Sequence, residues 1–206
     1  DGLEAAGLIK QIGKRIGQRG SPSVLYRLAP HRNFSVGIKI GRRALDAVLV
    51  DYAGEISARY SHEYRYPDPD IVLRAGNAAL RTFRAQVETI EDAVIVGLGI
   101  ASPYFLGGWS EELGFPTDLG PRWESIKLTS FFEVDAKMPV FIENDASAAA
   151  LAELTFGPGV EFRDFMHISI DTFVGGGLVQ GGKVNTGPHG NSAALGPLPV
   201  SPSRLK

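Results

Sequence analysis

Alternation of apolar and polar residues divides this chain into strand-like runs separated by turns. Residues 8–13 and 23–28 flank a Gly- and Arg-rich stretch and together predict a β-hairpin. After it, three further runs alternate in the same way: residues 34–40, 44–50 and 55–66. Consecutive runs of this kind, joined by short turns, predict an antiparallel meander.

Helical patterns occupy the middle of the chain. The sequence Asp68-Pro69-Asp70 predicts a helix start, and a 3.6-residue apolar stripe continues to Glu88. Residues 123–134 are also predicted to be helical. The Ala-rich residues 146–154 give the strongest helix prediction, with Asn144 or Asp145 as its N-cap.

Nearly continuous apolar runs at residues 93–100 and 140–142 predict buried strands, the first of them covered on both faces. A second meander is predicted near the end of the chain, with Gly181-Gly182 as a hairpin turn: residues 165–170, 177–180 and 183–184. The order of elements indicates one α/β lobe followed by the first strands of another.

Charge is distributed unevenly along the chain. Residues 1–43 contain nine Lys or Arg and two acidic residues, a balance of +7, whereas the remainder carries −9. A basic end on an acidic body is typical of a nucleic-acid-binding arm, and a solvated basic face is the alternative.

The chain contains no cysteine, which excludes disulfides, thiolate nucleophiles and cysteine-ligated metals. No apolar run is long enough for a transmembrane helix, so we expect a cytoplasmic protein without a membrane partner. The only methionines are Met138 and Met166, and the chain opens at Asp1, so we expect a fragment.

Candidate chemistry is concentrated where the strand at 140–142 meets the Ala-rich helix. Ligands of open α/β folds bind at the carboxyl ends of strands. There a carboxylate such as Asp145 can hold a hydroxyl group or remove its proton, and the Asn144 amide can donate to another oxygen. Plain helix capping is the alternative.

Residues 140–156 resemble the E-N-D-A-N-A-A-A-L-A-E signature of the ROK family of repressors and sugar kinases. Four other segments resemble family motifs in the right order: residues 34–41, 95–103, 174–179 and 187–196. The resemblance covers about residues 34–200. It implies an actin-like ATPase, ribonuclease H-like α/β lobe and the start of a second lobe.

Departures from the family pattern affect the phosphate motifs. Lys39 stands at the acidic position of D-I-G-G-T, and Arg42-Arg43 replace its Gly-Thr pair. Residues 171–173, Asp-Thr-Phe, replace the usual G-T-G. Since phosphoryl transfer depends on these cradles, we expect a catalytically inactive, kinase-like protein without a cofactor, although Asp145 stands at the family's general-base position.

The sugar side is altered as well. Residues 194–197 read Ala-Leu-Gly-Pro where the family has E-x-G-H, and its Cys-rich zinc motif is absent, so no metal is expected. The resemblance leaves Asn144, Asp145, Ser102 and His189 as ligand-binding candidates, although a lone loop histidine is more commonly just solvated.

Residues 8–28 resemble the wing of the winged helix-turn-helix that precedes the kinase-like domain in ROK repressors. Lys14, Arg15 and Arg19 would then contact DNA phosphates or the minor groove. The expected domains are a wing remnant at 1–32 and a ROK-type effector domain at 33–206. The base-reading helices are expected upstream, and the effector domain is expected to be truncated.

These observations predict a sugar- or small-molecule-responsive transcriptional regulator that binds DNA through its N-terminal domain. By the family pattern it would act as a homodimer or higher homo-oligomer, and ligand-driven lobe closure would alter the spacing of its DNA-binding heads. The alternatives are an active ATP-dependent sugar kinase and a ligand-blind assembly module.

Overall fold

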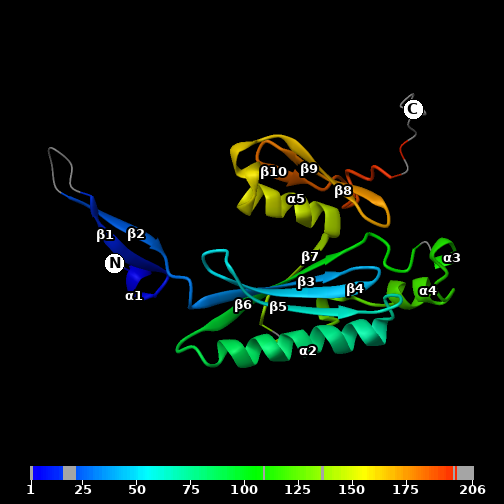
Figure 1. Ribbon diagram of the computed structural model, residues 1–206, viewed down its shortest axis with the longest axis horizontal. Coiled ribbons are helices and arrows are strands. Elements are labelled where there is room, and N and C mark those ends of the chain that lie inside the picture. The colour runs from blue at the N-terminus through cyan, green and yellow to red at the C-terminus, as the bar shows by residue number, and fades with distance from the viewer. Residues whose placement is uncertain (1, 16–21, 109, 136, 197, 199–206) are drawn as a thin grey trace. The chain divides into compact units, whose positions relative to one another are not determined.

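A computed structural model describes residues 2–15, 22–108, 110–135, 137–196 and 198 (Figure 1). The chain forms two compact units. The first comprises Asp1–Ile100 and Gly107–Ile142, and the second comprises Ala101–Leu106 and Glu143–Lys206.

The first unit begins with the predicted hairpin. After the short helix α1 (Gly2–Ala5), strands β1 (Ile9–Arg15) and β2 (Ser23–Leu28) pair antiparallel, with a bulge between Gln11 and Gly13. The Arg32 guanidinium ties this segment to the following sheet. Its Nη1 donates to Ala6 O (3.0 Å) and its Nη2 pairs with Asp92 Oδ2 (2.7 Å).

A five-stranded sheet of order β5-β4-β3-β6-β7 forms the body of this unit. Its strands are β3 (Asn33–Ile40), β4 (Ala44–Asp51), β5 (Ile56–Glu63), β6 (Val94–Ser102) and β7 (Val140–Asn144). The predicted meander of β3, β4 and β5 is confirmed as antiparallel. Alternate apolar residues of β3 are buried, as a sheet with one covered face requires: Phe34, Val36, Ile38 and Ile40.

Helix α2 (Pro69–Val87) runs along one face of this sheet (Figure 1). The predicted helix start is confirmed, and Asp68 is the N-cap, because its Oδ1 accepts from the N–H groups of Asp70 and Ile71. Burial alone would raise the pKa of Asp68, but hydrogen bonds from Arg122 and these N–H groups outweigh it and lower the pKa.

The predicted helix at 123–134 is wrong. Helix α3 (Ser110–Leu113) and helix α4 (Leu119–Glu124) precede a single 3-10 turn, Leu128–Ser130. Tertiary contacts draw the rest of this segment onto α2. Phe132 packs where a Cβ on Gly76 would otherwise lie, and Glu133 N–H donates to the buried Asn77 Oδ1 (2.9 Å).

Burial of the two apolar strands is only partial. Leu98 and Ile100 of β6 are buried, but Val94 and Val96 are 52% and 44% exposed. In β7, Phe141 is 67% exposed. The prediction of fully buried strands is therefore wrong for the start of β6 and for β7.

In the second unit, α5 (Asp145–Phe156) and a 3-10 turn (Pro158–Glu161) lead into a three-stranded antiparallel sheet of order β10-β9-β8. Its strands are β8 (Phe165–Ile170), β9 (Val174–Gln180) and β10 (Lys183–Asn185). Gly181 and Gly182 have φ of 60° and 75°, as the predicted two-residue hairpin turn requires.

Among the described residues, no helix is both long enough and apolar enough to span a bilayer.

Candidate functional site

The strongest sequence motif lies where β7 ends and α5 begins. Asn144 is the N-cap of α5, and its Oδ1 accepts from Ala146 N (3.1 Å) and Ser147 N (3.2 Å). Its own N–H donates to Glu143 Oε1 (2.8 Å). Asn144 therefore caps the helix, which is the structural alternative to a role in ligand binding. Because capping uses only Oδ1, the amide Nδ2 can still donate to a ligand oxygen.

Asp145 is the first residue of α5. Its Oδ1 accepts from Ala146 N (2.9 Å), which leaves Oδ2 to accept from another donor. The side chain is half-buried. A carboxylate at this position is stabilised by the partial positive charge of the helix N-terminus. Asn144 and Asp145 thus present an amide donor and a carboxylate acceptor at one helix end.

Glycines on β9 bring α5 close to the second sheet. A Cβ on Gly177 would lie 2.5 Å from both Ala146 O and Ala150 Cβ, and one on Gly175 would lie 3.4 Å from Ala146 Cβ. Gly176 faces the other side, where a Cβ would meet Leu195 Cδ1 at 2.8 Å. These glycines therefore have a packing role that accounts for their lack of side chains.

The other two ligand candidates also belong to the second unit. Ser102 ends β6 and is 6% exposed, whereas His189 lies exposed in the turn after β10. Among the described residues, no hydrogen bond or ion pair joins either of them to Asn144 or Asp145. In the part of the chain that the structure describes, no group of three His, Asp or Glu side chains could hold a metal ion.

The turn between β3 and β4 carries the altered first phosphate motif. Gly41 N–H donates to Ala44 O (2.8 Å), and a Cβ on Gly41 would lie 2.9 Å from that oxygen. Arg43 Nη1 donates to Arg65 O (2.6 Å), while its guanidinium lies 5.4 Å from the centroid of the Phe115 ring. The glycine and Arg43 therefore hold the turn itself together.

Tyr64 holds this turn from the end of β5. Its hydroxyl lies 2.7 Å from Gly41 O and 2.8 Å from Ala44 O, so its single proton is shared between two carbonyls. Burial, aided by the Asp46 carboxylate, raises the pKa of Tyr64 well above its usual value. The sequence reasoning missed Tyr64 because its partners are backbone carbonyls, which no side-chain motif identifies.

Both turns depart chemically from the phosphate motifs of the family pattern. Lys39 is exposed on β3 opposite Asp46, so an ammonium stands where the kinase motif has its acidic residue. In the β8–β9 turn, Asp171 N–H donates to Phe173 O (3.3 Å). An acidic, aromatic turn whose N–H points inward is a poor cradle for phosphate oxygens.

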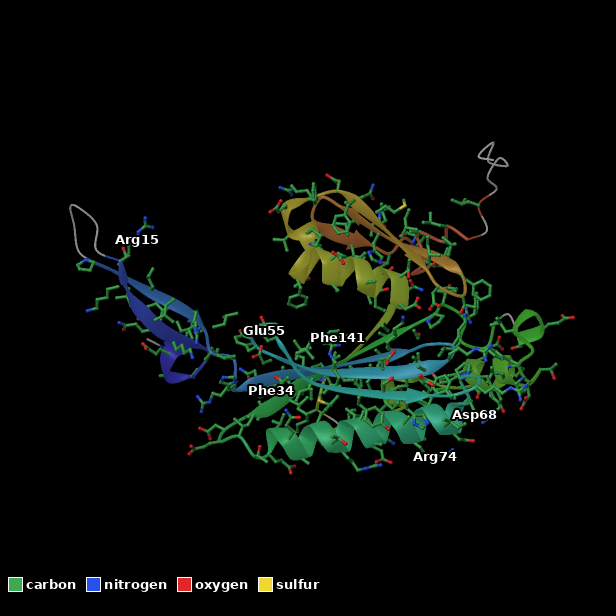
Figure 2. All side chains as sticks on the ribbon, viewed as in Figure 1. Arg15, Phe34, Glu55, Asp68, Arg74 and Phe141 are labelled. Carbon is green, nitrogen blue, oxygen red and sulfur yellow. The ribbon has the colours of Figure 1, made fainter. Side chains whose placement is uncertain are left out.

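The hairpin carries the predicted nucleic-acid contacts. Lys14 and Arg15 are exposed on β1, and Arg15 projects from its end (Figure 2). Arg19 lies outside the described residues. Besides these, Lys10 and Arg27 add cations on the paired strands, and the sequence reasoning passed over both of them.

Comparison with known proteins identifies the class to which this fold belongs. The model of the ROK family matches residues 35–205, and the chain belongs to that family. It is 32% identical over 193 residues to the uncharacterized protein y4fQ of Sinorhizobium fredii, covering 93% of this chain and 49% of that protein.

Named relatives include both repressors and sugar kinases. The chain is 25% identical to the xylose repressor of Bacillus spizizenii (94% of this chain, 49% of the repressor). It is 30% identical to the glucokinase of Streptomyces coelicolor (83% and 51%). The chain thus spans about half the length of the curated relatives it matches.

Solved structures include the same two kinds of protein. A ROK family transcriptional regulator, a homologue of the E. coli MLC protein, matches 97% of this chain and 50% of its own, with a TM-score of 0.65 and 26% identity. A ROK family glucokinase from Streptomyces griseus, in complex with glucose and AMPPNP, matches 84% and 52%, with a TM-score of 0.61 and 26% identity.

Proposed function

We propose that this chain is part of a ROK-type transcriptional regulator whose kinase-like domain senses a sugar or related small molecule and transfers no phosphate. One observation carries the proposal, and it concerns the first phosphate turn. There Gly41 N–H donates to Ala44 O, the Tyr64 hydroxyl binds the carbonyls of Gly41 and Ala44, and Lys39 stands at the acidic position of the motif. An ammonium does not ligate magnesium, which supports a turn that takes no part in metal-assisted phosphoryl transfer.

The effector would bind at the N-terminus of α5. Asp145 Oδ2 would accept a hydrogen bond from one sugar hydroxyl, and Asn144 Nδ2 would donate to the oxygen of another. The same pair occurs in the family signature that residues 140–156 resemble. Ser102 and His189 remain predicted contacts of the same ligand.

Strand β6 supports a route by which the effector could influence DNA binding. Val94 N–H, at its start, donates to Arg32 O (2.9 Å), and Arg32 also holds the N-terminal segment and Asp92. Ser102, a proposed ligand contact, is the last residue of the same strand. Coupling by this route would require β6 to have two arrangements that differ both at Ser102 and at Val94.

A coupled ADP assay with a panel of hexoses and the full-length protein tests the absence of catalysis. We expect no ADP release above that of a protein-free control, even at saturating sugar. ATP-dependent phosphorylation of any hexose would overturn the proposal. Asp145→Asn is the matched variant, since a true kinase would lose its general base with this change, whereas background activity would not respond.

The second candidate function is an active sugar kinase. The 30% identity to a named glucokinase favours it, together with the Asp145 carboxylate, which keeps one oxygen for a substrate hydroxyl.

A third possibility is a ligand-blind assembly module, in which β9 glycines and α5 serve packing alone. Isothermal calorimetry against the same sugars separates the module from the other two candidates, because only the module gives no heat with every sugar.

A further inference from the structure

The two faces of the N-terminal hairpin differ in charge, and the strand register assigns each residue to a face. Residues directly opposite each other in an antiparallel pair project to the same side, and successive residues along a strand alternate. Lys10 lies opposite Arg27, and Arg15 lies opposite Ser23. Since Arg27 and Ser23 are four residues apart on β2, all three cations share one face.

The bulge in β1 puts Lys14 on the other side. Past the bulge, Lys14 pairs with Val24, which shares its face with Tyr26 and Leu28. These three apolar side chains are 39%, 38% and 47% exposed, respectively. Although Lys14 and Arg15 are adjacent in sequence, one therefore belongs to an apolar face and the other to a basic face.

The Lys10–Arg27 pair is unfavourable in the protein by itself. Like charges directly opposite each other on paired strands repel and destabilise the pairing. Of the described residues between 2 and 31, Glu4 is the only one with a carboxylate, and no ion pair involving Lys10, Arg15 or Arg27 occurs in the described part of the chain. A bound polyanion would relieve this repulsion.

We propose that the face formed by Lys10, Arg15 and Arg27 contacts the phosphates of duplex DNA. Lys14, which the resemblance places among the DNA contacts, lies on the opposite face by the strand register and is withdrawn from that set. This inference rests on the proposed regulator function and names the surface that would meet the nucleic acid. The cross-strand pairs Lys10–Arg27 and Arg15–Ser23 are four residues apart on β2, which is about 13 Å along the strand. Their cations therefore reach different phosphates.

Salt dependence of binding tests the face assignment. The full-length protein is titrated with a fluorescent, mixed-sequence duplex DNA at several salt concentrations. Lys10→Gln, Arg15→Gln and Arg27→Gln are each expected to reduce the magnitude of the negative slope of log K against log salt by about 1, because each removes one phosphate contact. Lys14→Gln is the control, since it makes the same charge change on the other face and should leave the slope unchanged.

Several outcomes would count against this inference. An equal loss of slope for Lys14→Gln and Arg27→Gln would overturn the face assignment while leaving DNA binding intact. Tighter binding to an RNA duplex of the same sequence would overturn the choice of partner. Absence of salt-dependent binding by the unaltered protein would instead overturn the proposed function.

Thermal melting provides an independent readout of the hairpin. Neutralising Lys10 or Arg27 removes like-charge repulsion, so neither change should lower the melting temperature of the free protein. A drop in melting temperature for both variants would show that these cations serve the fold and would overturn the inference.

Discussion

The Asn144 side chain has two roles, capping of α5 and the proposed binding of the effector. Its Oδ1 accepts from two N–H groups at the start of α5, while its Nδ2 is the proposed donor to the effector. An alanine at this position would remove both duties at once, so its effect on ligand response would be confounded by loss of the cap. A residue that caps without an amide separates them.

We expect Asn144→Ala to lower the free energy of unfolding by about 1 kcal/mol, because the first turn of α5 loses its cap. Asn144→Ser should retain most of that stability, since serine is a comparable N-cap. Both variants should bind the effector more weakly than the unaltered protein. Urea denaturation measures the first effect and isothermal calorimetry the second. Full sugar affinity in Asn144→Ser would contradict the proposed role of Nδ2.

Tyr64 predicts how stability depends on pH. The pKa of its hydroxyl is raised in the folded state above the usual 10.0, so the folded protein keeps this proton when the unfolded chain loses it. This contribution is complete below pH 10 and declines as the pH rises above it. The stability of the unaltered protein should therefore fall in alkaline solution.

Tyr64→Phe removes both the proton and the hydrogen bond. The variant should be about 1 kcal/mol less stable at neutral pH, because the Gly41 and Ala44 carbonyls lose a part-buried donor. Its stability should also vary less with pH above 10 than that of the unaltered protein. Urea melts at neutral and alkaline pH make the comparison. Parallel pH profiles would contradict the buried, hydrogen-bonded hydroxyl.

At the scale of elements, the sequence pattern correctly predicted the helices and turns whose conformation depends on neighbouring residues. The capped helices α2 and α5 and the Gly181-Gly182 turn follow from capping and turn chemistry, and the structure confirms them. For the candidate site, the pattern identified Asn144 and Asp145 at a helix start. It could not identify Tyr64, whose role depends on backbone carbonyls 20 or more residues away.

The predictions failed where long-range contacts decide the conformation. The helix expected at 123–134 stops at Glu124, because the following aromatic residues are drawn toward α2. Phe132 occupies the space above Gly76, a position that no local pattern encodes. Exposure of Phe141 was missed for a related reason, since an apolar run does not reveal whether its strand is central or at an edge.

Packing of α5 against β9 gives a prediction with a matched control. Gly177→Ala places a Cβ 2.5 Å from Ala146 O, so α5 must move, and we expect a loss of about 1–3 kcal/mol. Gly175→Ala meets Ala146 Cβ at 3.4 Å, which is an ordinary contact, and should cost less. Urea denaturation of the two variants, followed by circular dichroism, gives the order. Equal stabilities would contradict the close approach of α5 to Gly177.

At the scale of the whole molecule, charge and motif both suggest that the N-terminal segment binds DNA and that the rest of the chain binds the effector. The first 43 residues carry +7 and include the hairpin, whereas the acidic remainder contains the proposed effector site. Arg32 joins the N-terminal segment to the sheet through Ala6 O and Asp92. In our account, sugar binding at α5 changes how tightly the basic face engages DNA.

The most direct test is a fluorescence-anisotropy titration of the full-length protein with DNA from its own upstream region, with and without each sugar of the panel. The account predicts saturable binding whose midpoint shifts in the presence of at least one sugar. It also predicts that Asp145→Asn binds the DNA equally well without sugar but loses the shift. Failure to bind this DNA in every ligand state would contradict the account.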